Sequence, residues 1–235
     1  MARSQAGYPF SPKQVGGCQL WLRSDLGVTL NGTGVAQWND QSGNANNVVQ
    51  ATPANQPVWN ASDANYGGKP SISFTQASSQ VLTGPNFTLA QPWSFFWVAT
   101  GTAPSTYKGV FGTVSSTLLA GTSNGSPPKW TVSTMASTTT SAATSCIVGW
   151  FSGFGVYGAS PNDAMFLNVS TSINGSHAAG PGSFDGTALQ VGCSNNTYFM
   201  DGTIAEIALF TNVITPSDVT NLMTYAGLQY GQTWA

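Results

Sequence analysis

Short apolar runs alternate with turn signals along most of the chain. The runs are rich in β-branched and aromatic residues, and Gly, Pro and Asn dipeptides such as Asn31-Gly32 separate them. The predicted strands fall at 18–22, 35–39, 47–50, 56–59, 71–75, 80–83, 93–99, 108–114, 117–120, 129–134, 146–151, 163–169, 188–192 and 202–210. Many short strands at this spacing are typical of a β-sandwich or barrel, so the pattern predicts an all-β domain.

Two of these runs indicate how the strands are covered. The run 93–99 is apolar at nearly every position, which predicts a central strand covered on both faces. The last strand alternates: Ala205, Ile207 and Leu209 form a wholly apolar set, which predicts the core face. Glu206 then falls on the opposite face of that strand.

One amphipathic helix is predicted after the last strand. Thr215 is a good N-cap, Pro216 suits the first helical position, and Asp218 completes a capping box. The helix is expected to end at Gly227 or Gly231. Its apolar face, at the i, i+3, i+4, i+7 spacing, consists of Val219, Leu222, Met223 and Ala226.

The first seventeen residues differ from the rest. Residues 1–17 are polar and rich in Gly and Pro, with Tyr8 and Phe10 as the only large apolar side chains. We therefore predict an N-terminal arm over 1–17 and a single sandwich domain over 18–235. Aromatic side chains dominate binding energy at interfaces, so Tyr8 and Phe10 are the predicted partner-binding anchors.

Three stretches together resemble one known family. They are the strand at 20–22 with Trp-Asn-Asp-Gln-Ser-Gly-Asn at 38–44, Gly-Lys-Pro-Ser-Ile-Ser-Phe at 68–74 with 80–82, and the strand-plus-helix closure at 201–231. In order and spacing they resemble the laminin-G-like branch of the concanavalin A-like lectin/glucanase superfamily. The resemblance implies a two-sheet antiparallel jelly-roll sandwich with one short C-terminal helix. It does not fix the function, because this fold hosts lectins, hydrolases, adhesion modules and virion proteins.

Composition narrows the classes of partner. Hydrophobic residues make up 41% of the 235 residues, whereas charged residues make up only 6%, against about 25% in typical globular domains. The formal net charge is −2, and the few Lys and Arg residues are scattered. Nucleic-acid binding needs a basic stripe and a membrane helix needs ~20 apolar residues, so we expect neither partner.

The three cysteines, Cys18, Cys146 and Cys193, have no metal-site spacing. A Cys18–Cys193 or Cys146–Cys193 disulfide stays open beside the alternative of free buried thiols. The first residues show no apolar signal-peptide core, which favours free thiols.

Acid–base chemistry is sparse. For a hydrolase of this superfamily, the resemblance implies a strand with the motif Glu-x-Asp-x-x-Glu, which this chain lacks. The single Glu of the chain, Glu206, falls at a family position that looks structural. The single histidine, His177, lies in a polar turn, and no Gly-x-Ser-x-Gly motif occurs. We expect no enzymatic activity.

Two kinds of binding chemistry remain. Asp40, Asp185 and Asp201 are candidate calcium ligands, although Asp in such Asn-Asp and Asp-Gly pairs also serves ordinary turns. Otherwise we expect no cofactor. Four aromatic side chains in polar or loop contexts are candidates for stacking against a sugar, with core or rim packing as the alternative. They are Tyr107, Trp130, Tyr157 and Tyr198.

Two functional classes follow from these expectations. The first is a non-enzymatic virion surface protein of a tailed phage, a capsid decoration or head-fibre component. Such a protein would assemble in the host cytoplasm as a homotrimer on other virion proteins, chiefly the major capsid protein. The alternative is a glycan-binding, lectin-like adhesion module.

Overall fold

The computed structural model describes residues 10–231, with gaps at 91, 102–106, 116–117, 123–128, 135–136, 146–148, 158–162, 168–172 and 176–183. Within these ranges the chain forms seventeen strands, one α-helix and four short 3-10 helices. Every strand pairing is antiparallel, and the pairings connect into a strongly curled system of two layers. The all-β sandwich that the sequence predicts is confirmed.

The layer next to the helix, here the helix-side sheet, is organised around β17. Strand β17 pairs with β8 along one edge, and with β6 and then β1 along the other. The helix-side sheet consists of β1 (Cys18–Arg23), β6 (Lys69–Phe74), β17 (Gly202–Phe210), β8 (Trp93–Gly101), β13 (Gly149–Tyr157), β14 (Asp163–Leu167) and β15 (Ile173–Gly175).

The second layer, here the far sheet, has β16 near its middle, between β7 and β9. It consists of β2 (Val28–Asn31), β3 (Gly34–Trp38), β4 (Val48–Val49), β7 (Leu82–Leu89), β16 (Phe184–Val191), β9 (Lys108–Thr113), β10 (Leu118–Thr122), β11 (Lys129–Thr134) and β12 (Ser137–Ser145). Strand β5 (Val58–Asp63) pairs with both β3 and β6 and so joins the two sheets. The 3-10 helices are η1 (Pro12–Gln14), η2 (Pro53–Asn55), η3 (Ala64–Tyr66) and η4 (Gln76–Ser78).

The main core fills the space between the sheets and is dominated by aromatic rings. Phe95, Trp97 and Phe111 pack with ring centroids 4.6–5.8 Å apart, and all three are fully buried. The neighbouring positions on β8, Phe96 and Val98, belong to a second apolar cluster on the other face. Strand β8 is therefore covered on both faces, as its sequence predicts.

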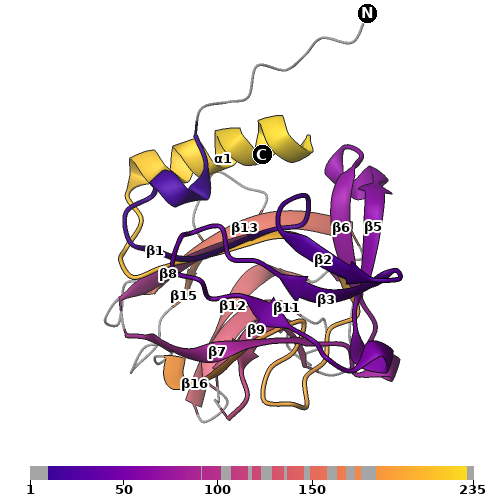
Figure 1. Ribbon diagram of the computed structural model, residues 1–235. Helices are drawn as coiled ribbons and strands as arrows, with labels where there is room; N and C mark the ends of the chain where they lie inside the picture. The colour runs from indigo at the N-terminus through magenta and orange to yellow at the C-terminus, as the bar shows by residue number, and fades with distance from the viewer. Residues whose placement is uncertain are drawn as a thin grey trace, which may run out of the picture.

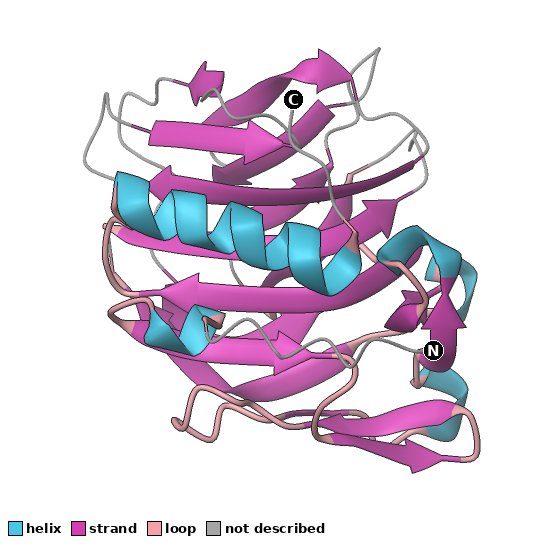
Figure 2. Cartoon of the chain, turned by 90° about the horizontal axis from the view of Figure 1, so that it is seen from above, coloured by secondary structure: helices cyan, strands magenta, loops and turns pink. Residues whose placement is uncertain are grey.

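Helix α1 (Pro216–Tyr230) lies across the outer face of the helix-side sheet (Figures 1 and 2). Thr215 and Asp218 form the predicted capping box, and the helix ends at Gly231, whose φ of +68° suits glycine. The second cluster beneath it consists of Val15, Trp21, Tyr66, Phe96, Val98, Ala205, Ala208, Phe210, Ile214, Leu222, Tyr225, Ala226 and Tyr230.

A bulge in β17 shifts the predicted alternation. The register of β17 against β8 slips between Ile204 and Glu206. Ile204 therefore joins the main core with Ile207 and Leu209, and Ala205 lies under the helix. The assignment of Ala205 to the core face is wrong, because strict alternation cannot carry across an extra residue.

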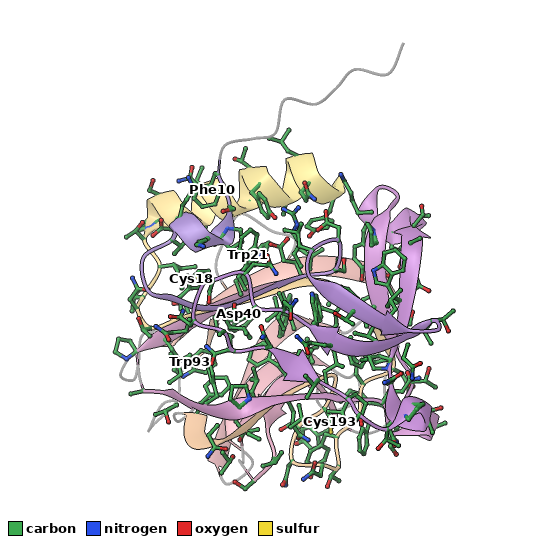
Figure 3. The ribbon with its side chains drawn as sticks, viewed as in Figure 1. Phe10, Cys18, Trp21, Asp40, Trp93 and Cys193 are labelled. Atoms are coloured by element: carbon green, nitrogen blue, oxygen red, sulfur yellow. The ribbon has the colours of Figure 1, made fainter. Side chains whose placement is uncertain are left out.

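The described part of the predicted arm packs on the domain. Phe10 lies edge-to-face on Tyr225 of α1, with centroids 6.4 Å apart, and Val15 is only 1% exposed. Figure 3 shows Phe10 beside the helix. Residues 10–17 of the predicted arm therefore pack on the sandwich, and Phe10 contacts α1. Tyr8 lies outside the described residues.

Two of the cysteines are described, and both are free. Cys18 is half-buried and Cys193 is buried, so the two disulfide pairings left open by the sequence do not form. Burial raises the pKa of each thiol to about 12, so both remain protonated at neutral pH. Cys146 lies outside the described residues. Among the described helices, none has the length and apolar character needed to cross a membrane.

Candidate functional site

Four strand ends meet at one rim of the sandwich. Gly202, which begins β17, pairs with the last residues of both β6 and β8, Phe74 and Gly101. Strand β9 begins nearby at Lys108, whose side chain contacts Asp201. The loop 192–201 closes this rim, and Figure 3 places Cys193, in that loop, on the side of the molecule away from α1.

A partly buried ion pair fixes the rim. Lys108 Nζ lies 3.0 Å from Asp201 Oδ2, and the other oxygen of Asp201 accepts the backbone N–H of Gln76 at 2.7 Å. The side chain of Lys108 is 9% exposed and that of Asp201 is 33% exposed. A lysine is rarely buried without a charge partner, and Asp201 supplies it while its carboxylate still reaches solvent.

Two tyrosines lie on the chain segments that carry this ion pair. Tyr107 precedes Lys108, and its ring packs edge-to-face on Tyr198 with centroids 5.7 Å apart. Both rings are half-buried, and the carbonyl of Tyr198 accepts the N–H of Gly109 at 2.8 Å. The structure therefore brings together two of the four predicted sugar-stacking residues, Tyr107 and Tyr198, on the segments that carry Lys108 and Asp201. We call Gln76, Tyr107, Lys108, Tyr198 and Asp201 the rim site.

The loop that carries Tyr198 is held in one conformation. Asn195 and Asn196 both adopt the left-handed region, with φ of +54° and +49°, and Asn tolerates this region better than most residues. Asn196 exchanges two hydrogen bonds, of 2.6 and 3.1 Å, with the buried Gln190. The Asn195 N–H donates to the Thr113 carbonyl at 2.9 Å. Strained residues so fully supported are typical of binding loops.

The other two aromatic candidates fall in different places. Trp130 pairs in register with Thr122, which pairs with Lys108, so the backbone of Trp130 lies at the same end of the far sheet as the rim site. Tyr157 pairs with Trp93, at the start of β8, which is the opposite end from Gly101. The fold therefore separates Tyr157 from the other three.

The three calcium candidates do not converge. Asp40 accepts hydrogen bonds from the backbone N–H groups of Trp21, Ser42 and Asn46 and from the Ser42 hydroxyl, at 2.7–3.0 Å. It therefore performs the turn role that the sequence offered as the alternative. Asp185 pairs in register with Thr88 at the far end of β16 from the rim. In the described part of the chain, no three His, Cys, Asp or Glu side chains gather in a metal-binding group.

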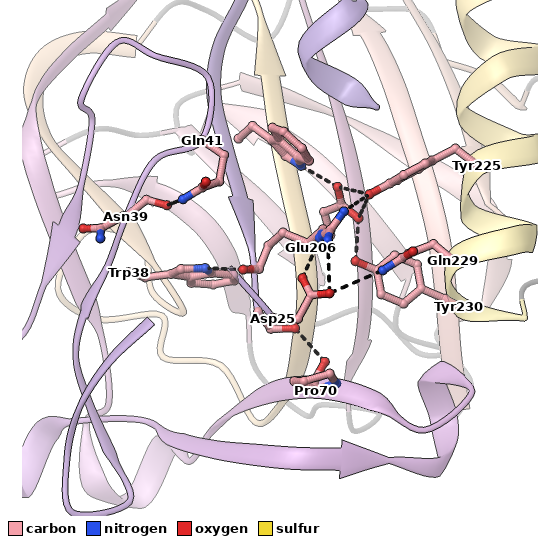
Figure 4. A network of polar contacts seen from close by, with 12 residues as sticks. Asp25, Trp38, Asn39, Gln41, Pro70, Glu206, Tyr225, Gln229 and Tyr230 are labelled. Atoms are coloured by element: carbon pink, nitrogen blue, oxygen red, sulfur yellow. Dashed lines mark hydrogen bonds and ion pairs between the residues drawn. The ribbon is translucent and has the colours of Figure 1, made fainter. Parts of the chain in front are cut away.

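Glu206 is sealed under α1 (Figure 4). Its carboxylate accepts hydrogen bonds from Trp21 Nε1 at 2.5 Å, the Tyr230 hydroxyl at 2.5 Å and the Tyr225 hydroxyl at 3.0 and 3.1 Å. Burial raises its pKa to about 7, although these donors favour the charged form. The side chain is fully buried, so it ties β1, β17 and α1 together and does not reach any ligand.

Two residues of the rim site, Gln76 and Lys108, were not singled out from the sequence. In the amino-acid sequence Lys108 is one of several scattered charged residues, because its partner Asp201 is distant in the chain. The available signal was its position directly after a candidate aromatic, Tyr107, at the start of an apolar strand.

Comparison with known proteins defines the fold class. No protein-family model matches the chain, and no curated protein matches its sequence. Among solved structures, domain 4 of AbnA, a GH43 extracellular arabinanase from Geobacillus stearothermophilus in complex with arabinotriose, is similar with a TM-score of 0.61 at 10% identity. The match covers 89% of this chain and 99% of that domain.

Larger proteins contain the same fold as one part. A GH54 α-L-arabinofuranosidase matches with a TM-score of 0.57 at 15% identity, over 94% of this chain and 61% of its own. Trypanosoma rangeli sialidase in complex with sialic acid matches with a TM-score of 0.52 at 11% identity, over 90% of this chain and 33% of the sialidase. This chain therefore spans less than two thirds of these two proteins. At such identities the likeness establishes the lectin-like β-sandwich fold.

Proposed function

We propose that the chain is a non-enzymatic, lectin-like module that binds a glycan at the rim site. The observation that supports this most directly is the Tyr107–Tyr198 ring pair, which lies on the same two segments of the chain as Lys108 and the partly exposed Asp201. Sugars present C–H groups on their ring faces and hydroxyls at their edges. Aromatic rings bind the first and carboxylates accept hydrogen bonds from the second.

The rim site is also preformed, which lowers the entropic cost of binding. The Asp201 carboxylate is held by two donors, and the loop carrying Tyr198 is fixed through Asn195 and Asn196. Little reordering is then required when a ligand arrives.

Catalysis receives no support from the acidic residues that are described. Glycoside hydrolysis generally uses two positioned carboxylates. Glu206 is buried beneath α1, and Asp201 is the only acidic member of the rim site, where Lys108 neutralises it. We therefore propose binding without turnover.

The structural neighbours support the same proposal. The AbnA domain is described in complex with arabinotriose, and the binding domain of Paraclostridial Mosquitocidal Protein 1 shares the fold with a TM-score of 0.53 at 11% identity. That match covers 92% of this chain and 53% of the toxin domain.

A glycan array followed by calorimetry on the best ligand tests the proposal. Tyr107→Ala and Tyr198→Ala should each weaken binding by about tenfold, since stacking and aromatic burial are worth ~1–2 kcal/mol. Leu228→Ala, at an exposed position on α1, is the control and should bind normally. Failure of the chain to bind any glycan, or binding unchanged in both tyrosine variants, would contradict it.

We further propose that the module is displayed on the surface of a tailed-phage virion, as a capsid decoration or head-fibre component contacting the major capsid protein. The free, protonated thiols of Cys18 and Cys193 suit assembly in a reducing host cytoplasm. The sparsely charged surface suits close packing on a particle. Peptide mass spectrometry of gradient-purified particles tests this setting, and recovery of the chain only outside the particles would reject it.

A further inference from the structure

We propose that the rim site takes an uncharged saccharide with neighbouring hydroxyls, and that it binds this ligand without calcium. The inference rests on the proposed glycan-binding function and specifies its ligand class. It is carried by how Lys108 and the backbone of Gln76 hold Asp201, with the Tyr107–Tyr198 ring pair on the adjoining segments.

The charges of the rim site cancel. Lys108 and Asp201 form an ion pair at 3.0 Å. The sequence places no other charged residue at 75–80, at 102–107 or at 192–200. A saccharide carrying a carboxylate or sulfate would lose hydration here without gaining an unpaired cationic partner from the rim site, which costs free energy. An uncharged saccharide pays no such cost.

The ammonium group of Lys108 stands where a bridging cation would have to bind Asp201. Calcium prefers six to eight oxygen ligands, with several carboxylates among them. At the rim site Asp201 is the only carboxylate, one of its oxygens is bound by Lys108, and the other accepts the Gln76 N–H. A divalent ion would also be repelled by the ammonium group. Lys108 therefore fixes the carboxylate in the way a metal ion would.

The carboxylate retains capacity for hydroxyl donors. An ionised carboxylate accepts about four hydrogen bonds, and the two donors from Lys108 and Gln76 leave room for about two more. The side chain of Asp201 is one-third exposed, so it is accessible to a ligand from solvent. In the proposed complex, two neighbouring hydroxyls of one sugar residue would donate to Asp201, and the half-buried rings of Tyr107 and Tyr198 would receive its C–H groups.

The experiment compares neutral, carboxylated and sulfated oligosaccharides on the full chain, with and without EDTA. We expect binding among the neutral set, with an affinity that EDTA changes by less than twofold. Asp201→Asn should weaken binding about tenfold, because an amide supplies one acceptor oxygen in place of two and leaves Lys108 without its anionic partner. Lys108→Met should also weaken binding, because it leaves the carboxylate unsupported. Melting curves of both variants verify folding, and Tyr198→Ala provides a third variant that leaves the ion pair intact.

The outcomes separate this inference from the function it rests on. Binding confined to acidic saccharides and removed by Tyr198→Ala would retain the glycan-binding site and overturn the uncharged ligand. Lys129 begins β11 next to Trp130, so its backbone lies at the same end of the far sheet as the rim site. A preference for acidic saccharides that Lys129→Gln removes would also overturn the uncharged ligand. Binding abolished by EDTA and restored by calcium would overturn the metal-independent mechanism. Binding to no saccharide would reject the proposed function itself.

Discussion

At the scale of single residues, Glu206 makes the stability of the domain depend on pH. Its pKa is raised to about 7 from 4.5 by burial. Between those pH values the folded protein keeps a proton that the unfolded chain has released, so the free energy of unfolding falls as pH rises. The contribution of protonated Glu206 to the free energy of unfolding is complete below about pH 4.5 and lost above about pH 7. It amounts to at most ~3 kcal/mol.

The measurement compares urea unfolding of the wild type and Glu206→Gln from pH 4.5 to 8. The glutamine is neutral at every pH, so the difference between the two proteins isolates this one group from the seven aspartates. Wild-type stability should decline relative to Glu206→Gln across this range. A constant difference, or one that moves in the opposite direction, would show that Glu206 is ionised in the folded protein throughout.

Two glycines with similar backbone angles should respond differently to alanine. Gly192 has φ of +79°, and an added Cβ would lie 2.1 Å from the Phe74 ring. Gly231 has φ of +68°, and a Cβ there would meet nothing within 4 Å. Gly231→Ala should cost only the left-handed penalty of ~1 kcal/mol, whereas Gly192→Ala should cost ~3 kcal/mol or more because Phe74 must move. Equal losses in denaturant unfolding would contradict the steric argument.

At the scale of elements, packing on the sheet is what stabilises α1. Leu222 is fully buried against the second cluster, whereas Leu228 on the same helix is 49% exposed. Leu222→Ala should lower the free energy of unfolding by ~2–5 kcal/mol, and Leu228→Ala by less than ~1 kcal/mol. The helix propensity change is the same in both, so the difference reports burial alone. Similar losses measured by urea unfolding would mean that α1 is not docked as described.

Features that depend on neighbouring residues could be predicted from the sequence, whereas features that depend on contacts between distant segments could not. The capping box of Thr215 and Asp218 lies within four neighbouring positions, so the start of α1 was readable directly. The bulge at Ile204 depends on how β17 aligns with β8, and no local pattern announces it. The same limit applies to the rim site. The aromatic character of Tyr107 and Tyr198 identifies them as candidates, whereas the ion pair between Lys108 and Asp201 cannot be predicted from two distant positions.

The terminal segment shows a second limit. Residues 10–17 have the composition of an arm, with Phe10 as an isolated aromatic among Gly, Pro and polar residues. Their apolar groups are nevertheless enough to pack on a surface that α1 and β1 already provide, since Phe10 contacts Tyr225 and Val15 is buried. Composition describes what a segment can bury alone, whereas docking depends on the surface it finds.

At the scale of the whole molecule, the scarcity of charge favours self-association, and we predict a homotrimer. Only 6% of the residues are charged and the net charge is −2, so copies of the chain repel one another weakly. A closed ring about a threefold axis satisfies identical interfaces without leaving an open end. Mass photometry or light scattering at micromolar concentration should then find three times the 24.4 kDa of one chain. Because few charges are involved, raising the salt from about 0.1 to 1 M should leave this mass unchanged.

A single species of 24.4 kDa under all these conditions would remove the support for a particle-bound trimer. The glycan-binding proposal would stand unaffected, since every residue of the rim site comes from one copy of the chain.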